Sequence, residues 1–262
     1  MHGEERERLI LDAIGERGFV TYQALQSRLS ASPATIRRDL ARLAEAGLIE
    51  RVHGGARLVS GRPDGKGDAG LRLTGASFEQ SLLDRIDQKR AIGKAAAGLC
   101  RANEGIMVDG GTTTFQMCPH LAGLGLQVLT NSLHIVSALL PQTGTQILVP
   151  SGSVFRDQNI ILAPEGEESM PRFHAPRLFM GAAAIGPQGI MQADVLLVAG
   201  ERRFIDRAEE IVICADSSKF TRSSGNVVCP LDDVDILVTD EGIGKDSVDM
   251  IEAAGIKLVI AV

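Results

Sequence analysis

Apolar positions in the N-terminal segment recur at helical spacing and predict two short helices. Over residues 4–17, apolar side chains return every three or four positions among charged ones, and Gly18 ends the pattern. A short extended piece begins at Phe19, and Thr21 is a candidate N-cap for a second helix over residues 22–29. The chain is therefore expected to open with a helix, an extended piece and a helix.

A third helix is expected to begin at Ser32 and Pro33, because serine is a favoured N-cap and proline suits the first helical position. Its apolar side holds Ile36, Leu40 and Leu43, and the side that can face outward holds Thr35, Arg38 and Arg42. Beyond it, residues 48–52 and 56–59 flank a His-Gly-Gly turn, a pattern typical of a two-stranded ribbon. We interpret residues 1–59 as a winged helix-turn-helix domain with this ribbon as its wing.

From about residue 76, helical and strand signals alternate. Residues 60–75 contain Gly, Pro and charge without periodicity and are expected to form a linker. A long helix is expected from residue 76 to Cys100, and a shorter one near residues 113–122. Candidate strands lie at 105–109, 126–130, 146–149, 178–180, 211–215, 236–239 and 257–262. This β-α-β-α order predicts an open parallel sheet with covered faces, in an α/β domain over residues 76–262.

Composition and charge refine this organisation. The 262 residues exceed a usual single domain, so one large or two unequal domains are expected, and 44% apolar content is ample for a core. Only 3% of the residues are aromatic, which suits close-packed α/β layers. The formal charge of −6 argues against indiscriminate binding to nucleic acid. Residues 28–57 are nevertheless basic, with six arginines against three acidic residues.

The cysteines and the absence of apolar runs indicate a cytoplasmic protein. Cys100, Cys118, Cys214 and Cys229 are far apart and lack metal-ligand spacing, so buried free thiols in a reducing compartment are expected. The N-terminus is charged, without the apolar core of a signal peptide, and no run is long enough to span a membrane. We expect no metal, no cofactor and no membrane partner.

The third helix carries the chemistry of a major-groove reader. Arginine can bond guanine bidentately, threonine can touch a thymine methyl, and a helix N-terminus favours phosphate. The candidates on the first turns are Ser32, Ala34, Thr35, Arg37 and Arg38. Alternatively, Arg37 and Arg38 solvate an ordinary helix and pair with Asp39 or Glu45.

This head resembles the DeoR family of bacterial regulators. The resemblance lies in SPATIRRDLARLAEAGLIERVHGGA, residues 32–56. It implies that the third helix is the recognition helix and that Arg51, His53 and Arg57 help to hold the DNA backbone, with Arg42 as a further candidate contact.

Two strand-to-helix junctions in the second domain are typical of a small-anion site. Residues 109–114, DGGTTT, combine glycines that allow close backbone approach with hydroxyl donors, and phosphate is the natural occupant. Glycine and threonine also serve ordinary turns. At the second junction, Asn131 and Ser132 follow a strand, and Asn131 can hydrogen-bond a sugar hydroxyl. Lys219 can bring a cation to the same sheet edge, or it is a turn lysine that faces solvent.

The second domain also resembles the DeoR family, in its sensor half. The matching segments are KRAIGKAAAGL (89–99), DGGTTT (109–114), LTNS (129–132), FHAPRLFMGA (173–182) and ADSSKF (215–220). The resemblance implies a fold similar to ribose-5-phosphate isomerase and the coenzyme A transferases. It further implies that Thr112, Thr113 and Thr114 cradle a phosphate and that Asp109, Asn131 and Lys219 line a sugar pocket.

The remaining candidate effector residues are Gly110, Gly111, Ser132 and Gly152. Lys89 either adds charge to the pocket or lies on a solvated helix face. The chain departs from the family where Ala183 and Ala184 stand in place of a usual Asp-Gly pair, which removes an acid from the pocket, and where Ser151-Gly152 stands for Gly-Gly. An atypical ligand is therefore expected.

We expect a repressor of a carbohydrate-utilisation operon, with no catalytic residues. Its partners would be double-stranded operator DNA and a phosphorylated sugar, and paired heads imply a homodimer or homotetramer. One alternative is a sugar-phosphate isomerase with an appended DNA-binding head, for which Asp109 and Asp216 are the available bases, although Asp216 can simply cap its helix. Another is an architectural DNA-binding protein that has lost its ligand.

Overall fold

The computed structural model describes residues 6–7, 9–11, 19–21, 25, 29, 31, 33–45, 49–52, 55–58, 78–162 and 170–262. Contacts divide the chain into two units, residues 1–67 and 68–262. The expected linker, residues 60–75, lies outside the described residues, as do Ser32 and His53. Each unit is described by itself below.

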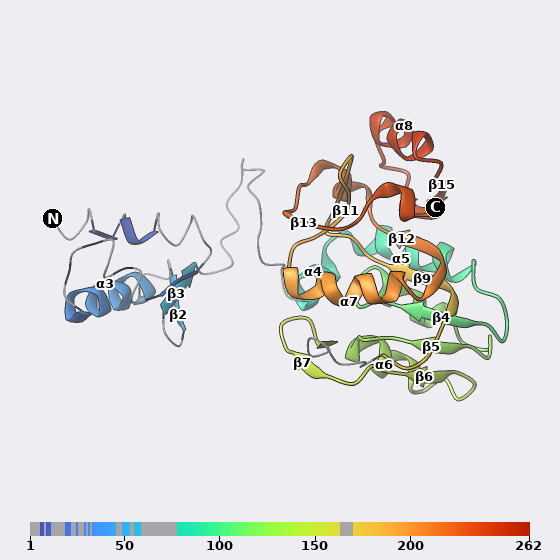
Figure 1. Cartoon of the computed structure of the whole chain (residues 1–262), viewed down its shortest axis with the longest axis horizontal. Helices are drawn as coiled ribbons and strands as arrows, with labels where there is room; N and C mark the ends of the chain where they lie inside the picture. Colours follow the sequence, from blue (N-terminus) through green and yellow to red (C-terminus); the bar gives the residue numbers. More distant parts are fainter. Residues whose placement is uncertain are drawn as a thin grey trace. The chain divides into compact units, whose positions relative to one another are not determined.

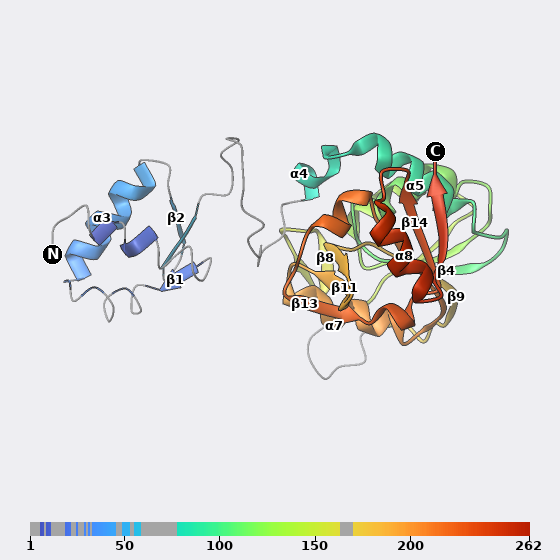
Figure 2. The same cartoon turned by 90° about the horizontal axis from the view of Figure 1, so that it is seen from above.

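The N-terminal unit is built on one amphipathic helix and a small sheet. Helix α3 (Pro33–Glu45) buries Ile36, Leu40 and Leu43, as its apolar spacing predicts. Strands β1 (Phe19–Thr21), β3 (Gly55–Leu58) and β2 (Ile49–Val52) pair antiparallel in that order. The expected two-stranded wing is confirmed, and the extended piece at Phe19 joins it as a third strand (Figures 1 and 2).

The C-terminal unit is organised by a seven-stranded sheet whose neighbouring strands all run parallel. The strands in sequence order are β4 (Gly105–Val108), β5 (Gln127–Leu129), β6 (Gln146–Leu148), β9 (Ala175–Met180), β12 (Ala208–Cys214), β14 (Ile236–Asp240) and β15 (Lys257–Ala261). Their spatial order is β15-β14-β12-β9-β4-β5-β6. The predicted parallel α/β domain is therefore confirmed.

Helices cover both faces of this sheet because alternate strand residues point to opposite sides. On one face, Met107 packs in a core with Val198 and Phe204 of α7 (Val195–Ile205) and with α8 (Lys245–Ala253). On the other face, Val108 packs with α5 (Ile86–Ala97), with η1 (Thr114–His120), which is a 3₁₀ helix, and with α6 (Leu133–Leu139). Figure 2 shows α5 and α7 on opposite sides of the strands.

The expected single helix from residue 76 to Cys100 is wrong. Residues 78–97 form two helices, α4 (Phe78–Leu83) and α5, and the chain turns between them at Arg85, whose φ is 53°. A left-handed backbone is unfavourable for arginine and needs support from its surroundings. That support is tertiary, because the Arg85 guanidinium contacts Ser217 and Asp240 far along the chain.

Several short elements have no counterpart in the expected strand pattern. They are the hairpin of β7 (Ser153–Phe155) and β8 (Ile160–Leu162), the antiparallel sheet of β10 (Ala184–Gly186), β11 (Gly189–Gln192) and β13 (Asn226–Cys229), and the 3₁₀ turns η2 (Ser217–Thr221) and η3 (Leu231–Asp233). Each strand of these sheets has three or four residues, too few to display a clear alternation of burial.

The four cysteines are free thiols, as expected; three of them are buried and Cys100 is half-buried. Among the described residues, no helix combines the length and the apolar character that crossing a membrane requires.

Substitution of Gly93 is expected to destabilise the C-terminal unit, because a Cβ at this position would lie 2.5 Å from the backbone carbon of Gln116 in η1. Overpacking of this kind costs about 1–3 kcal/mol, so Gly93→Ala should lower the urea midpoint of unfolding. Gly200→Ala is the matched control, since a Cβ there meets nothing within 4 Å and alanine is the better helix former. Equal stability of the Gly93 variant and the wild type would contradict the close contact between α5 and η1.

Candidate nucleic-acid interface and effector site

Helix α3 has a polar side, and the basic residues on it differ in whether they form ion pairs with acidic residues. Arg38 is exposed, and Thr35 is half-buried. The exposed Arg42 pairs with Glu7 at 2.6 Å and with Asp39 at 3.0 Å. Outward placement is therefore confirmed for Arg38 and Arg42, and Arg42 also has a structural role.

Asp39 connects α3 to the first helical segment of the N-terminal unit. Its carboxylate is 1% exposed and accepts hydrogen bonds from Arg6 Nε at 2.6 Å and from Arg42 at 3.0 Å. A buried carboxylate needs such partners to offset the loss of hydration. Among the described side chains, Asp39 thus pairs with Arg6 and Arg42 and not with Arg38. The candidate pairing with Arg37 stays a prediction, because that side chain is outside the described part of the structure.

The side chains of the remaining predicted DNA-contacting residues are not among those that the structure describes. Ala34 and Arg37 belong to α3, Arg51 to β2 and Arg57 to β3, while Ser32 and His53 lie outside the described residues. The recognition role of these six positions stays a prediction.

The candidate effector site lies where the strand order of the C-terminal sheet reverses. Strands β5 and β6 lie on one side of β4, and β9, β12, β14 and β15 lie on the other. Loops that leave the carboxyl ends of β4 and β9 therefore diverge, and a crevice forms between them in sheets of this type. A Cβ built on Gly181, directly after β9, meets nothing within 4 Å.

Asp109 and Asn131 are brought together at this edge. Asn131 Nδ2 donates to Asp109 Oδ1 at 2.8 Å, and its Oδ1 accepts from the Gly110 N–H at 3.0 Å. Both side chains are buried. Burial raises the pKa of Asp109 to about 6, against the lowering effect of the hydrogen bonds from Asn131 and Gly110. The two residues form a polar floor between β4 and β5.

The glycine-threonine loop is shaped by internal hydrogen bonds. The Thr114 hydroxyl is fully buried and donates within the loop, 2.8 Å from the Asp109 carbonyl and 3.0 Å from the Gly111 carbonyl. It stabilises the turn; Thr113 is also buried, and Thr112 is half-buried. Ile160 lies against Gly110, where an added Cβ would meet its Cδ1 at 2.8 Å.

Ser132 lies beside this loop, because a Cβ added at Gly110 would meet the Ser132 Cβ at 3.1 Å. Ser132 is buried and caps α6 by accepting from the Ile135 N–H at 3.4 Å. Gly152 is exposed and directly precedes β7, which pairs with β8.

A second polar cluster at the same edge joins the ends of β12 and β14 to the turn before α5. The Arg85 guanidinium lies 3.1 Å from Asp216 and 3.4 Å from Asp240, and it donates to Ser217 Oγ at 2.9 Å. Asp216 also caps η2 by accepting from the Ser218 N–H at 3.1 Å. Burial alone would raise the pKa of Asp240, but hydrogen bonds from Ser217 and Gly242 and the charge of Arg85 lower it.

Lys89 and Lys219 bring positive charge into the same region. Lys89 is 3% exposed and donates to the Ser81 carbonyl, so a solvated helix face is the wrong interpretation of this residue. Burial lowers the pKa of Lys89, and the charge of Lys219 lowers it further. Burial likewise lowers the pKa of Lys219, while Asp216 raises it. Two partly desolvated cations close enough to influence each other form a site that an anion would stabilise.

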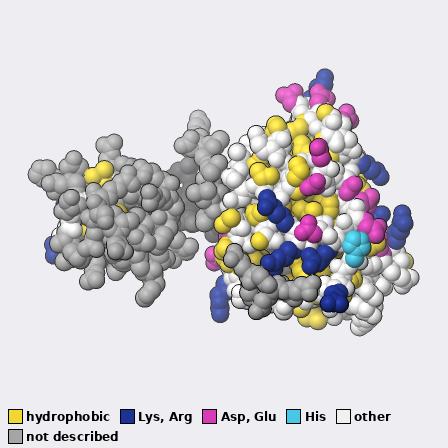
Figure 3. Space-filling view, viewed as in Figure 1, with side chains coloured by type: hydrophobic (Ala, Val, Ile, Leu, Met, Phe, Trp, Pro, Cys, Tyr) yellow, Lys and Arg dark blue, Asp and Glu magenta, His cyan; other side chains and the backbone are white. Residues whose placement is uncertain are grey.

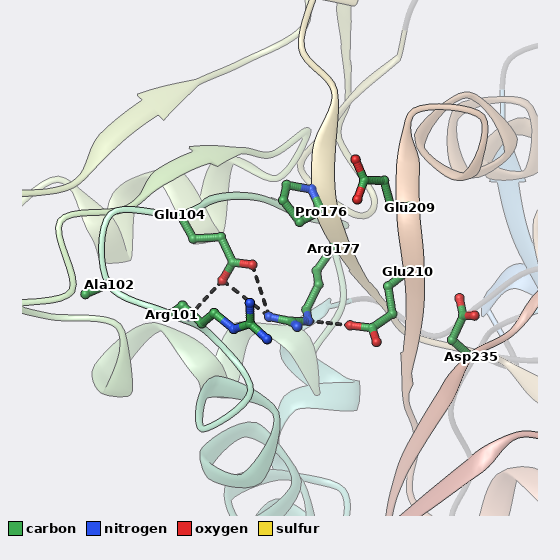
Figure 4. Close-up of a pocket in the computed structure, with 8 residues that line it drawn as sticks. All are labelled: Arg101, Ala102, Glu104, Pro176, Arg177, Glu209, Glu210 and Asp235. Carbon is green, nitrogen blue, oxygen red and sulfur yellow. Dashed lines mark hydrogen bonds and ion pairs between the residues drawn. The ribbon is translucent and has the colours of Figure 1, made fainter.

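A hollow at the opposite, amino-terminal edge of the sheet has different chemistry. It measures about 630 Å³ and is lined by Arg101, Ala102, Glu104, Pro176, Arg177, Glu209, Glu210 and Asp235 (Figure 4). Arg177 is held there by Glu104 at 3.0 Å, by the Leu99 carbonyl at 2.7 Å and by Glu210. Four acids face two arginines in this hollow, and two of those acids already pair with Arg177, which disfavours a phosphate here.

Comparison with protein families agrees with both units. The DeoR-like helix-turn-helix domain matches residues 6–62, and the DeoR C-terminal sensor domain matches residues 84–241. This chain belongs to the DeoR family. As a DeoR-family protein with a helix-turn-helix region and a sensor region, it is a transcription regulator.

Full-length relatives of this DeoR-family regulator carry the same description. The HTH-type transcriptional regulator UlaR of Shigella dysenteriae serotype 1 (strain Sd197) is 27% identical over 256 residues, which are 97% of this chain and 98% of the relative. UlaR of Escherichia coli (strain SMS-3-5 / SECEC) has the same identity and coverage. The likeness therefore extends over both units.

The similarity of this chain to solved structures is weaker than its similarity to the UlaR sequences. Ribose 5-phosphate isomerase A from Methanocaldococcus jannaschii has a TM-score of 0.38 at 14% identity, covering 52% of this chain and 54% of that one. eIF2B beta from Chaetomium thermophilum also has a TM-score of 0.38 at 14% identity, covering 60% of this chain and 50% of that one. Similarities at this level carry no argument about the function of the DeoR-family regulator.

One polar residue near the site was not anticipated from the sequence. Glu201 of α7 is 3% exposed; its Oε1 accepts from Gln192, and its Oε2 is buried without a hydrogen-bond partner in the described structure. Burial raises the pKa of Glu201 to about 8, and the negative charge of Asp109 contributes. The sequence signal was only a glutamate one turn after apolar residues of α7, which is usual on amphipathic helices.

The stability of the DeoR-family regulator is expected to depend on Glu201 ionisation. Between pH 4 and 8 the unfolded state releases this proton while the folded state retains it, so the free energy of unfolding falls as pH rises. Glu201→Gln should remove this dependence and be more stable than the wild type at pH 8, by on the order of 3 kcal/mol, with a smaller difference at pH 5. Urea unfolding at both pH values measures it.

The exposed Glu252 of α8 supplies the matched control, since Glu252→Gln should change stability equally at both pH values. A Glu201→Gln variant that follows the wild type in parallel across this range would show that Glu201 is already ionised in the fold.

Proposed function

We propose that this regulator is a repressor whose α3 helix and wing bind operator DNA in the cytoplasm, and whose DNA affinity changes when a phosphorylated sugar binds at the carboxyl edge of the C-terminal sheet. The observation that carries the sensing role is the pairing of two chemistries at the strand reversal. Lys89 and Lys219 supply desolvated positive charge for a phosphate, and Asp109 with Asn131 supplies hydrogen-bonding groups for hydroxyls. A phosphorylated sugar has both a phosphate for the lysines and hydroxyl groups for Asp109 and Asn131.

DNA binding is supported by the charge and exposure of α3. Arg38 is exposed and in the same helix as the buried Leu40, so the apolar side holds the helix while the basic side stays accessible. Such a helix is the size and shape that the major groove admits. Because phosphate contacts release counterions, each one should contribute a slope of about −0.9 to log K against log salt.

Regulation requires that the effector bind one arrangement of the DNA-binding units better than another, usually with about 1–3 kcal/mol of coupling. A homodimer or homotetramer would present paired heads to paired half-sites. Release from DNA on effector binding is the expected direction for a repressor of carbohydrate utilisation.

The isomerase alternative has less support from the site. Asp216 caps η2 and pairs with Arg85, and Asp109 accepts a hydrogen bond from Asn131, so both candidate bases have structural partners. Conversion of ribose 5-phosphate by the purified protein would favour the enzyme over the regulator.

Arg38→Ala is expected to abolish operator footprinting without changing the unfolding curve, because the side chain is exposed and removes no core contact. Arg90→Ala in α5 is the control, as an equally exposed arginine in the sensor unit that should leave the footprint intact. A normal footprint from the Arg38 variant would remove this residue from the interface.

Lys219→Gln is expected to weaken binding of inorganic phosphate by about tenfold or more, since a charged hydrogen bond is worth about 1.5–3 kcal/mol. Isothermal titration calorimetry with phosphate measures this directly. The exposed Lys245 of α8 serves as control, and Lys245→Gln should bind phosphate as the wild type does. Unchanged affinity in the Lys219 variant would place the anion elsewhere.

A further inference from the structure

Glu201 is a buried acid whose surroundings satisfy only one of its two oxygens. Its Oε1 accepts a hydrogen bond from Gln192 Nε2, whereas Oε2 is buried with no partner among the described residues. An unsatisfied buried polar atom costs about 1–3 kcal/mol, and its persistence in a folded protein calls for an explanation. A ligand that completes the hydrogen bond is one such explanation.

The position of Glu201 is fixed by the contacts of α7. Gln192 is itself anchored, because its Oε1 accepts from the Ala193 N–H at 2.8 Å and its carbonyl accepts from Ser224 Oγ at 2.6 Å. The neighbouring Arg202 donates to the Val228 and Val227 carbonyls, both at 2.8 Å. Basic side chains gather over the face where α7 lies (Figure 3), while Glu201 points inward with 3% exposure.

Glu201 lies within electrostatic reach of the candidate effector site. The charge of Asp109 acts on it directly, and α7 contacts β8 and β9, the strands beside that site. Ile160 of β8 lies against Gly110, and the open space at Gly181 follows β9. The residues after Gly181 are Ala182, Ala183 and Ala184, which offer no acid.

We propose that Glu201 is an effector-contacting residue that determines specificity, with its free Oε2 hydrogen-bonding a hydroxyl group on the sugar part of a phosphorylated ligand whose phosphate lies near Lys89 and Lys219. This inference rests on the proposed function and deepens it. It assigns to α7 the acidic group that residues 182–184 lack. The phosphate of the ligand would then bind near Lys89 and Lys219, and its sugar part would bind Glu201 of α7.

The protonation state of Glu201 suits this role. A pKa of about 8 leaves the carboxyl neutral at pH 7, so Oε2 can donate to a hydroxyl oxygen without bringing a second negative charge beside Asp109 and the phosphate. The titratable groups that face it are Asp109 after β4 and Cys229 of β13, whose own pKa burial raises to about 12 with smaller contributions from Asp233 and Glu201. Sugar-phosphate binding should therefore weaken as pH rises from 7 to 9.

Two variants test the contact. Glu201→Ala removes it and should weaken sugar-phosphate binding by about tenfold, the worth of one buried hydrogen bond, with inorganic phosphate affinity unchanged. Glu201→Gln keeps an oxygen for Gln192 and places an NH₂ donor toward the ligand, so it should bind within about threefold of the wild type at pH 7 and lose the weakening toward pH 9. Glu252→Ala is the exposed control.

The measurement is calorimetric titration of the full chain with inorganic phosphate, ribose 5-phosphate, glucose 6-phosphate and fructose 6-phosphate, after urea unfolding has verified each variant. A wild type that binds no phosphate compound overturns the proposed function itself. If phosphate binds but no sugar phosphate binds more tightly, or if Glu201→Ala weakens phosphate and sugar phosphate equally, the contact with Glu201 is wrong while the phosphate site stands. Selective loss for the sugar phosphates supports it.

Discussion

The reversal of strand order between β4 and β9 is the constraint on which the sensor half of this regulator depends. Because the loops after these two strands turn in opposite directions, the sheet leaves room at its carboxyl edge without breaking a single strand pairing. The parallel register also brings the ends of β5, β12 and β14 to the same edge. Groups from five separate segments of the chain therefore lie along one edge of the sheet.

The polar groups at this edge form two clusters. The carboxyl groups of Asp109 and Glu201, whose pKa values burial raises, lie after β4 and on α7. Lys89, Lys219 and Arg85 lie with Asp216 and Asp240 near η2 and the turn before α5. Arg85 is neutralised by Asp216 and Asp240, whereas Lys89 is bonded to a backbone carbonyl, which leaves its charge available. A ligand with an anionic end and a hydroxylated end fits this separation of charge.

The same arrangement separates sensing from catalysis. An isomerase needs a carboxylate that is free to take a proton from carbon, and here the two candidate bases are engaged: Asp216 caps η2 and pairs with Arg85, and Asp109 accepts from Asn131. Engaged acids can bind and orient a ligand without reacting with it. Family membership, which identifies a transcription regulator, agrees with this chemistry.

Local sequence determined the elements that form from interactions among residues close together in the chain. The apolar spacing of Ile36, Leu40 and Leu43 defined α3, the apolar runs defined the seven parallel strands, and DGGTTT marked the turn after β4. These features depend on neighbours within a few residues, so the pattern along the chain contains them.

Tertiary structure decided what depends on distant partners. Helical periodicity runs through Arg85, but its left-handed backbone interrupts the helix where its guanidinium contacts Ser217 and Asp240. Lys89 looked equally suited to solvent or to a pocket, and Glu201 looked like an ordinary helix residue, until packing against the sheet buried both. Burial raises the free-energy cost of an ionised group and of an unsatisfied hydrogen-bonding atom. Which groups are buried depends on how close α7 lies to the end of β4, and the spacing of residues along the sequence does not give that distance.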